Sequence, residues 1–487
     1  MNRSDTCPAT TAGLSGGAAA RPYRLWQLLA VMLLLAMLAA CAAGPGYEAP
    51  KAETPERFTH ADASTSAAAP VLTWWRELGD ETLGGLVEEA LVENHDLRIA
   101  RANIARARAL LRIDRLERLP VVTADASLSR ERASDARIGA PSSTDTFYEA
   151  GFDARWELDL FGRVTRTVEA AAAEYDATVA DAQDVEVVVA AEVARNYVEL
   201  RGAQFRLAVA RRNADNQAQT LALTRLLLDN GRGTEFDVSR AVAQLETTRA
   251  SIPPLEALVA RATHRLAVLS GRAPATLAVQ LAEPAPLPAM PARIAIGDPA
   301  SLLRRRADVR AAERRLAALT ARAGIAAADL FPHVSLGGAA GFLAAGAGDF
   351  GDSGSGYYRF GPFLSWPAFD LGRVRARIDA AEADVDAGLA AYEQTVLGVL
   401  EETENSLVEY ARAREREASL AAATAASKNA VALAQARYRN GVDSFLVVLD
   451  AERRLFEAQS THAEAGTDTA LAVVRLYKAL GGGWSRT

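Results

Sequence analysis

A long helix–turn–helix pattern that occurs twice constrains this chain more than any other feature. Asn230-Gly231 opens the segment NGRGTEFDVSRAVAQL, and Asn440-Gly441 opens the similar segment NGVDSFLVVLDAERRL, at an offset of 210 residues (441 − 231). Each pair ends 69 residues without proline, from Gly162 to Asn230 (230 − 162 + 1) and from Gly372 to Asn440 (440 − 372 + 1). Asn and Gly both tolerate positive φ, so they reverse a chain at little cost. We therefore expect two tandem copies of one unit.

The proline-free runs predict unusually long helices. At 1.5 Å per residue, a helix over either run spans on the order of 100 Å, far more than a helix in an ordinary domain. Such a helix needs packed helical neighbours along its length.

Composition excludes several classes of function. Hydrophobic residues make up 50% of the 487 residues, and the net charge is −7. A nucleic-acid partner is not expected, because phosphate binding needs a surplus of clustered Lys and Arg. The two cysteines, Cys7 and Cys41, lie near the N-terminus, and the five histidines are scattered. No metal site, cofactor site or catalytic constellation can be located, so we expect no enzymatic activity.

The N-terminus has the pattern of an export signal. Arg21 and Arg24 precede the apolar run LWQLLAVMLLLAMLAA, which ends at Cys41. The sequence LAAC resembles a bacterial lipobox, which predicts a signal peptide at 1–40 and lipidation of Cys41. An ordinary signal peptide with an incidental cysteine is the alternative. Ala42 stands where lipoproteins of the inner membrane typically carry Asp, which favours the outer membrane. Residues 41–82 are expected to form a lipidated, extended tether, in which the stretch 44–70 has little core of its own.

The two repeats are expected at 83–272 and 300–487, joined by a proline-rich linker at 273–299. The first is predicted to contain a helix or two stacked helices, strands at 121–131 and 146–160, and a long helix at 162–230. A return helix is predicted at 234–271, with a break at Pro253-Pro254. The second is predicted to contain a helix, strands at 333–345 and 356–369, a long helix at 372–440 and a return helix at 442–480.

The strand patterns allow two interpretations. Apolar and polar residues alternate most clearly from Tyr148 to Leu160, which gives one apolar face and one charged face. A soluble sheet packed on a core is the commoner origin of such alternation. A transmembrane barrel strand, with lipid on one side and water on the other, is favoured here by the export signal and the charged face.

Four strands cannot close a barrel, and an open sheet edge cannot face lipid. Bacterial single-chain barrels start at eight strands. A barrel would therefore have to be shared, and three chains would supply about twelve strands (3 × 4), enough to enclose water. The residues alone thus predict an α+β membrane protein: a lipid-anchored oligomer with one composite β-barrel and a very long helical extension.

Several segments resemble the outer membrane factor family of tripartite efflux pumps, within it the lipoprotein, OprM-type branch of TolC-like channels. They are LAAC followed by GPGYEAP, the paired GR turns, ARYRNGVDSFLVVLDAERRLFEAQ and VVRLYKALGGGW. The resemblance implies a homotrimer whose composite 12-stranded β-barrel, with four strands per chain, crosses the outer membrane. A long α-helical barrel would continue it into the periplasm. The same resemblance implies docking to a periplasmic adaptor and an RND-type inner-membrane pump, and passive export of drugs or other small toxic compounds.

The resemblance also implies a gate at the periplasmic tip, formed by Leu446 and Asp450. Residues four apart lie on one face of a helix, so in a trimer each would form a ring: an apolar plug and a carboxylate ring that selects cations. Arg453 is expected to pair with Asp450 and hold the tip closed, and Tyr438 to contribute gate contacts. A core role for Leu446 and a solvated surface role for Asp450 are the alternatives. Val447 stands where a second Asp occurs in TolC, so a double-aspartate ring is not expected.

A non-conducting structural lipoprotein, a coiled-coil spacer or adhesin, is the alternative function. It would share the lipobox and the long helices, but it would not need strands with one charged and one apolar face.

Overall fold

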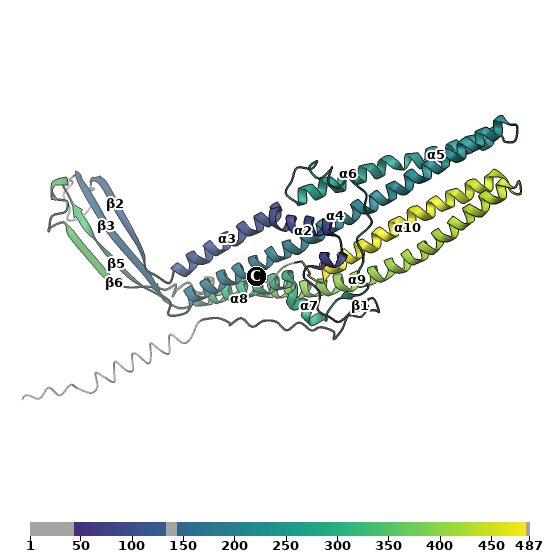
Figure 1. Ribbon diagram of the computed structural model, residues 1–487. Helices are drawn as coiled ribbons and strands as arrows, with labels where there is room; N and C mark the ends of the chain where they lie inside the picture. The colour runs from purple at the N-terminus through teal and green to yellow at the C-terminus, as the bar shows by residue number, and fades with distance from the viewer. Residues whose placement is uncertain (1–42, 133–143, 484–487) are drawn as a thin grey trace, which may run out of the picture. The chain divides into compact units, whose positions relative to one another are not determined.

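The computed structural model describes residues 43–132 and 144–483, and this part of the chain divides into two units (Figure 1). The strand unit comprises residues 43–44, 117–132, 144–165 and 324–375, and the helical unit comprises 45–116, 166–323 and 376–483. Each unit takes segments from both sequence repeats. The predicted signal peptide and Cys41 lie outside the described residues.

The strand unit contains one antiparallel sheet of four strands in the order β2-β3-β5-β6. The strands are β2 (Val121–Arg132), β3 (Thr144–Leu158), β5 (His333–Ala344) and β6 (Gly356–Ser365).

The register of the sheet gathers the apolar residues on one face. Ala124 pairs with Phe152, Phe152 with Ala340, and Ala340 with Tyr358. Directly paired residues point to the same side of a sheet, so the four strands share one apolar face. Phe152 is 63% exposed and Tyr358 80% exposed in the single chain.

The opposite face is polar. Asp153 lies 3.6 Å from the guanidinium of Arg359, and the Tyr357 hydroxyl donates to Glu149 over 3.0 Å. Charged and hydroxyl groups therefore meet across three strands on this face, which also carries the apolar side chains of Leu343 and Phe363.

Two predicted strands extend too far at their C-terminal ends. The strand predicted at 146–160 ends at Leu158, because the Asp159 carboxylate accepts from the backbone N–H of Val164 (2.9 Å) and so caps the following helix. The strand predicted at 356–369 ends at Ser365, because Pro367 has no N–H for a ladder and begins a turn in which Asp370 N–H donates to the Pro367 carbonyl (2.9 Å).

Two very long helices and their return helices dominate the helical unit (Figure 1). The long helices are α4 (Arg163–Asp229, 67 residues) and α9 (Leu371–Arg439, 69 residues). The second return helix is α10 (Phe445–Ala479, 35 residues). The first is broken at Ser251 into α5 (Glu235–Ala250) and α6 (Ile252–Leu269), because α6 has proline in its first turn and proline lacks the N–H that a continuous helix needs.

Shorter elements complete the described chain: η1 (Trp74–Leu78), α2 (Glu81–Glu93), α3 (His95–Leu116), α7 (Pro299–Arg305), α8 (Ala307–Ala328) and η2 (Ala347–Asp349). A short parallel pair joins β1 (Thr65–Ser66) to β4 (Ile294–Ala295). Among the helices of the described residues, none is both long enough and apolar enough to cross a membrane.

The main hydrophobic core lies where the middle of α4 and the end of α10 meet the N-terminal segment. Trp74 stacks on Tyr477 with ring centroids 5.0 Å apart, and the Tyr477 hydroxyl donates to Glu77 over 2.6 Å. Phe58, Trp74 and Trp75 are all at most 3% exposed. The expectation that residues 41–82 form an extended tether, with little core at 44–70, is therefore wrong from Phe58 onward. The high proline and alanine content of the segment gave no sign that Phe58, Trp74 and Trp75 pack into the core.

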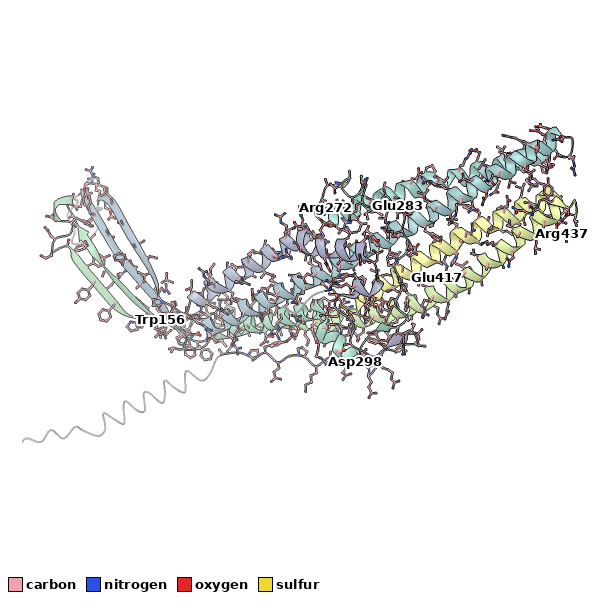
Figure 2. All side chains as sticks on the ribbon, in the orientation of Figure 1. Trp156, Arg272, Glu283, Asp298, Glu417 and Arg437 are labelled. Carbon is pink, nitrogen blue, oxygen red and sulfur yellow. The ribbon has the colours of Figure 1, made fainter. Side chains whose placement is uncertain are left out.

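The two repeats make matching contacts. The Trp156 indole donates to the Arg118 carbonyl and the Trp366 indole to the Leu330 carbonyl, each over 3.0 Å, and Figure 2 labels Trp156. The offset of 210 (366 − 156) is that of the Asn-Gly turns, and the offset of 212 (330 − 118) is also that between Pro120 and Pro332, which end the helical patterns before the strands of the two repeats. Both repeats thus fix the C-terminal end of a strand, β3 or β6, by the same tryptophan hydrogen bond.

Candidate functional site: the hairpin tips

The helical unit ends in two tips, where α4 turns into α5 and α9 turns into α10 (Figure 1). Gly231 (φ 69°) and Gly441 (φ 70°) occupy the left-handed region in the two turns. Each N–H donates back into the helix over 2.9 Å, from Gly231 to the Leu228 carbonyl and from Gly441 to the Tyr438 carbonyl.

The next residue donates further back in both tips, from Arg232 to the Leu227 carbonyl (2.8 Å) and from Val442 to the Arg437 carbonyl (3.0 Å). This bond pattern with glycine at the left-handed position is the Schellman motif. The side chains of Asn230 and Asn440 each bind the carbonyl four residues earlier. The four turn residues predicted from the sequence thus lie in two matching turns.

The two tips differ in how the return helix begins. Thr234 and Asp237 form a full capping box at the start of α5. Ser444, at the same place before α10, forms no side-chain capping bond. Asp443 instead binds Arg437 through two hydrogen bonds of 2.6 and 3.0 Å, and Figure 2 shows Arg437 at the end of α9.

Leu446 and Asp450 lie one turn apart near the start of α10, as their spacing predicts. Leu446 is 45% exposed in the single chain, and the Asp450 side chain is 44% exposed. Asp450 accepts from Arg453 Nη2 and from Arg454 Nε, each over 2.9 Å. The hydrogen bond from Arg453 and the charge of Arg454 lower the pKa of Asp450, so its carboxylate stays ionised at neutral pH.

Both arginines that bind Asp450 belong to α10 itself. The ion pair with Arg453 therefore orients the carboxylate but does not connect α10 to another helix of the chain. The second partner, Arg454, was missed in the sequence, although four-residue spacing on a helix is a sufficient signal for it.

Tyr438 packs against Phe445 across the second turn, with ring centroids 5.4 Å apart. Around it, residues of both hairpins form a second, smaller hydrophobic core: Ala214, Leu221, Val238, Ala241, Leu245, Ala434, Phe445, Val448 and Leu449. The two hairpins are thus packed together near their tips within one chain.

Comparison with known proteins identifies the class. The model of the outer membrane efflux protein family matches residues 86–272 and 299–482, and the chain belongs to this family. The family and outer-membrane location predicted from the sequence are confirmed, and so is the function as an efflux channel.

Three relatives are close over nearly the whole chain. Outer membrane protein OprJ of Pseudomonas aeruginosa is 35% identical over 459 residues, covering 94% of this chain and 96% of the relative. The toluene efflux pump outer membrane protein TtgI of Pseudomonas putida is 33% identical over 463 residues, covering 93% and 98%. The solved structure of the outer-membrane channel OprN is 44% identical with a TM-score of 0.87, covering 91% of this chain and 100% of that one. This likeness confirms the predicted fold class for the single chain, an α+β membrane protein in which a few strands are joined to very long helices.

Proposed function

We propose that three copies of this chain pool their strands into one 12-stranded barrel through the outer membrane, continued by a helical barrel in the periplasm. One observation carries the proposal. Within the described residues, the outer strands β2 and β6 each pair on one side only, while large apolar residues cover one exposed face of the sheet. A lipid-exposed sheet cannot keep open edges, so each edge must pair with a neighbouring chain.

The proposed conduit is passive and has no catalytic step. It receives its cargo from a periplasmic adaptor and an RND-type inner-membrane pump. Drugs or other small toxic compounds are its proposed cargo. The relative TtgI is named for toluene efflux, which supports small apolar toxic compounds within this class. The non-conducting structural lipoprotein fits less well, because the exposed apolar face of the sheet would then lie in water.

The proposed gate is a pair of rings at the tips. Three copies of Leu446 form an apolar constriction, and three copies of Asp450 form a carboxylate ring one turn away that favours cations. Arg453 and Arg454 set the orientation of the carboxylates, and Tyr438 braces the turn against Phe445.

The mature chain is proposed to begin at an acylated Cys41, held in the outer-membrane lipid. Mass spectrometry of the purified N-terminal peptide would show the added acyl mass. Finding an unmodified Cys41 within a longer mature chain would contradict this part of the proposal.

The assembly is tested on protein extracted from outer membranes in detergent. The mass of the complex should be about three times that of one chain, and the protein should form ion-conducting pores in planar bilayers. A monomer that conducts nothing would contradict the shared barrel and favour the structural lipoprotein.

A further inference from the structure

Glu452 is a buried carboxylate in the seam between the two helical hairpins. It lies on α10 but is only 9% exposed, although its neighbours Arg453 and Arg454 are on the surface. Its oxygens accept from Thr220 of α4 (3.2 Å) and from Gln435 of α9 (3.1 Å). One side chain therefore connects three helices, and α4 belongs to the other hairpin.

The seam beside Glu452 contains a cavity of about 510 Å³ with both polar and apolar lining residues. Its lining on α4 is made of neutral amide and hydroxyl groups with one leucine, and its lining on α9 includes Gln435, Tyr438 and Arg439. The amide oxygen of Gln217, a residue only 4% exposed, lacks a hydrogen-bond partner there. A protonated carboxyl supplies an O–H donor, which a seam with an unpaired acceptor can use.

The charged and titratable groups that line this cavity are Glu452, Arg439 and Tyr438. Arg439 Nε donates to the Gln435 carbonyl over 3.3 Å, and the pKa of Tyr438 is raised by burial. On α10, Arg453 and Arg454 bind Asp450. None of these described groups forms an ion pair with Glu452. The loss of water around its carboxylate is therefore offset by hydrogen bonds from two neutral side chains, Thr220 and Gln435.

Burial raises the pKa of Glu452 above its ordinary value of 4.5, and the bonds from Gln435 and Thr220 oppose the rise only in part. The packed seam therefore binds the proton more tightly than a seam opened to water. By linkage, acid favours the packed arrangement and alkali favours the opened one.

We propose that Glu452 is a proton-controlled latch between the two hairpins. When protonated, it stays in the packed seam between α4 and α9. When ionised, it favours an arrangement in which water enters the seam and α10 moves away from α4. This inference rests on the proposed function, because the movement of α10 would displace the rings of Leu446 and Asp450.

Single-channel recording of the full-length trimer in planar bilayers tests the latch. As the pH falls from about 8 to about 5, the ratio of open to closed channels should drop about tenfold for each pKa unit that separates the two arrangements. Glu452→Gln cannot ionise, so its channels should show the low-pH ratio throughout this range. The matched control is Glu464→Gln, which removes an exposed carboxylate from the same helix and should leave the pH response intact.

The outcomes separate the latch from the gate. If the wild type conducts but Glu452→Gln keeps the full pH response, the latch is wrong while the channel stands. If neither the wild type nor a variant with a truncated gate conducts at any pH, the proposed channel and the latch both fail.

Thermal unfolding gives a second readout that needs no conductance. The raised pKa means that wild-type stability from this group is complete below its ordinary value and is lost as the pH rises through the raised value. Glu452→Gln should therefore melt at a higher temperature than the wild type at pH 8, and the difference should vanish at about pH 4. A lower melting temperature for Glu452→Gln at pH 8 would overturn the latch.

Discussion

At the scale of single residues, the second tip combines an apolar side chain and a fixed charge within one helical turn. Leu446 is part exposed in one chain, and Asp450 is held ionised by two arginines. In a ring of three chains, the leucines would exclude water from the closed tip, and the carboxylates would attract cations to the open tip.

Removing both groups should widen the tip. Leu446→Ala with Asp450→Ala is expected to raise single-channel conductance several-fold and to weaken cation selectivity. Planar bilayer recording measures both quantities. Leu433→Ala is the control, because it truncates another exposed leucine, on α9, outside the proposed rings. Conductance equal to the wild type in the double variant would rule out this gate.

The left-handed glycine of the second turn should matter for stability. Gly441→Ala places a side chain at φ 70°, which costs about 1–2 kcal/mol, and the melting temperature should fall. The control Gly85→Ala lies inside α2, where an added Cβ meets no atom within 4 Å, and it should gain up to about 1 kcal/mol. Equal melting temperatures for the two variants would show that Gly441 does not need its positive φ.

Glu452 shows what the residue pattern could and could not reveal. It follows the buried Val448 by four residues, which places it on the packed face of α10 and was a usable signal. A glutamate beside two arginines nevertheless has the pattern of a solvated surface. Only the packing of α4 against α10 shows that its carboxylate is enclosed.

At the scale of elements, the sequence was most informative where a helical pattern ran over many residues or where apolar and polar residues alternated strictly. Asn-Gly pairs and proline-free runs predicted both hairpins to within a few residues. The alternation in β3 predicted its two faces, and the sheet register aligns those faces. The pairing order β2-β3-β5-β6 was not predictable, because alternation within a strand carries no information about its neighbour.

Helix crossings were equally invisible in the sequence. At Gly202, an added Cβ would press deep into the side chain of Thr467, so α4 and α10 approach closely at this point. A glycine inside a long helix lowers its helix propensity, and the close approach is the physical reason for keeping it.

Gly202→Ala should therefore destabilise the protein even though alanine is the better helix former. The expected loss is about 1–3 kcal/mol, as for other overpacked sites. Thr467→Ala in the same chain should restore part of that loss by removing the hydroxyl and methyl groups. Thermal unfolding of the two single variants and the double variant measures the coupling. Strict additivity of the two changes would contradict a contact between them.

At the scale of the whole molecule, the sheet has one face for lipid and one for water. Phe360 is 85% exposed on the apolar face of β6, and the next residue, Gly361, faces the polar side, where an added Cβ meets nothing within 4 Å. Placing a lysine at each of these adjacent positions therefore tests the lipid-facing and the water-facing side of the same strand.

Phe360→Lys should reduce assembly in the outer membrane sharply, because a lysine facing lipid near the bilayer centre costs about 2–4 kcal/mol per chain. Gly361→Lys should assemble, and its added positive charge should reduce cation selectivity. Heat-resistant trimer on gels and selectivity in bilayers measure these effects. Equal assembly of the two variants would contradict the assignment of the faces.

The unequal caps of the two tips affect the symmetry of any motion. Each chain supplies one tip closed by a Thr234–Asp237 box and one whose Ser444 makes no such bond. In the proposed ring of three chains, six hairpin tips would then alternate between tips with the capping box and tips without it. We therefore expect a ring built this way to widen mainly through movement of the three tips that lack the Thr–Asp capping box.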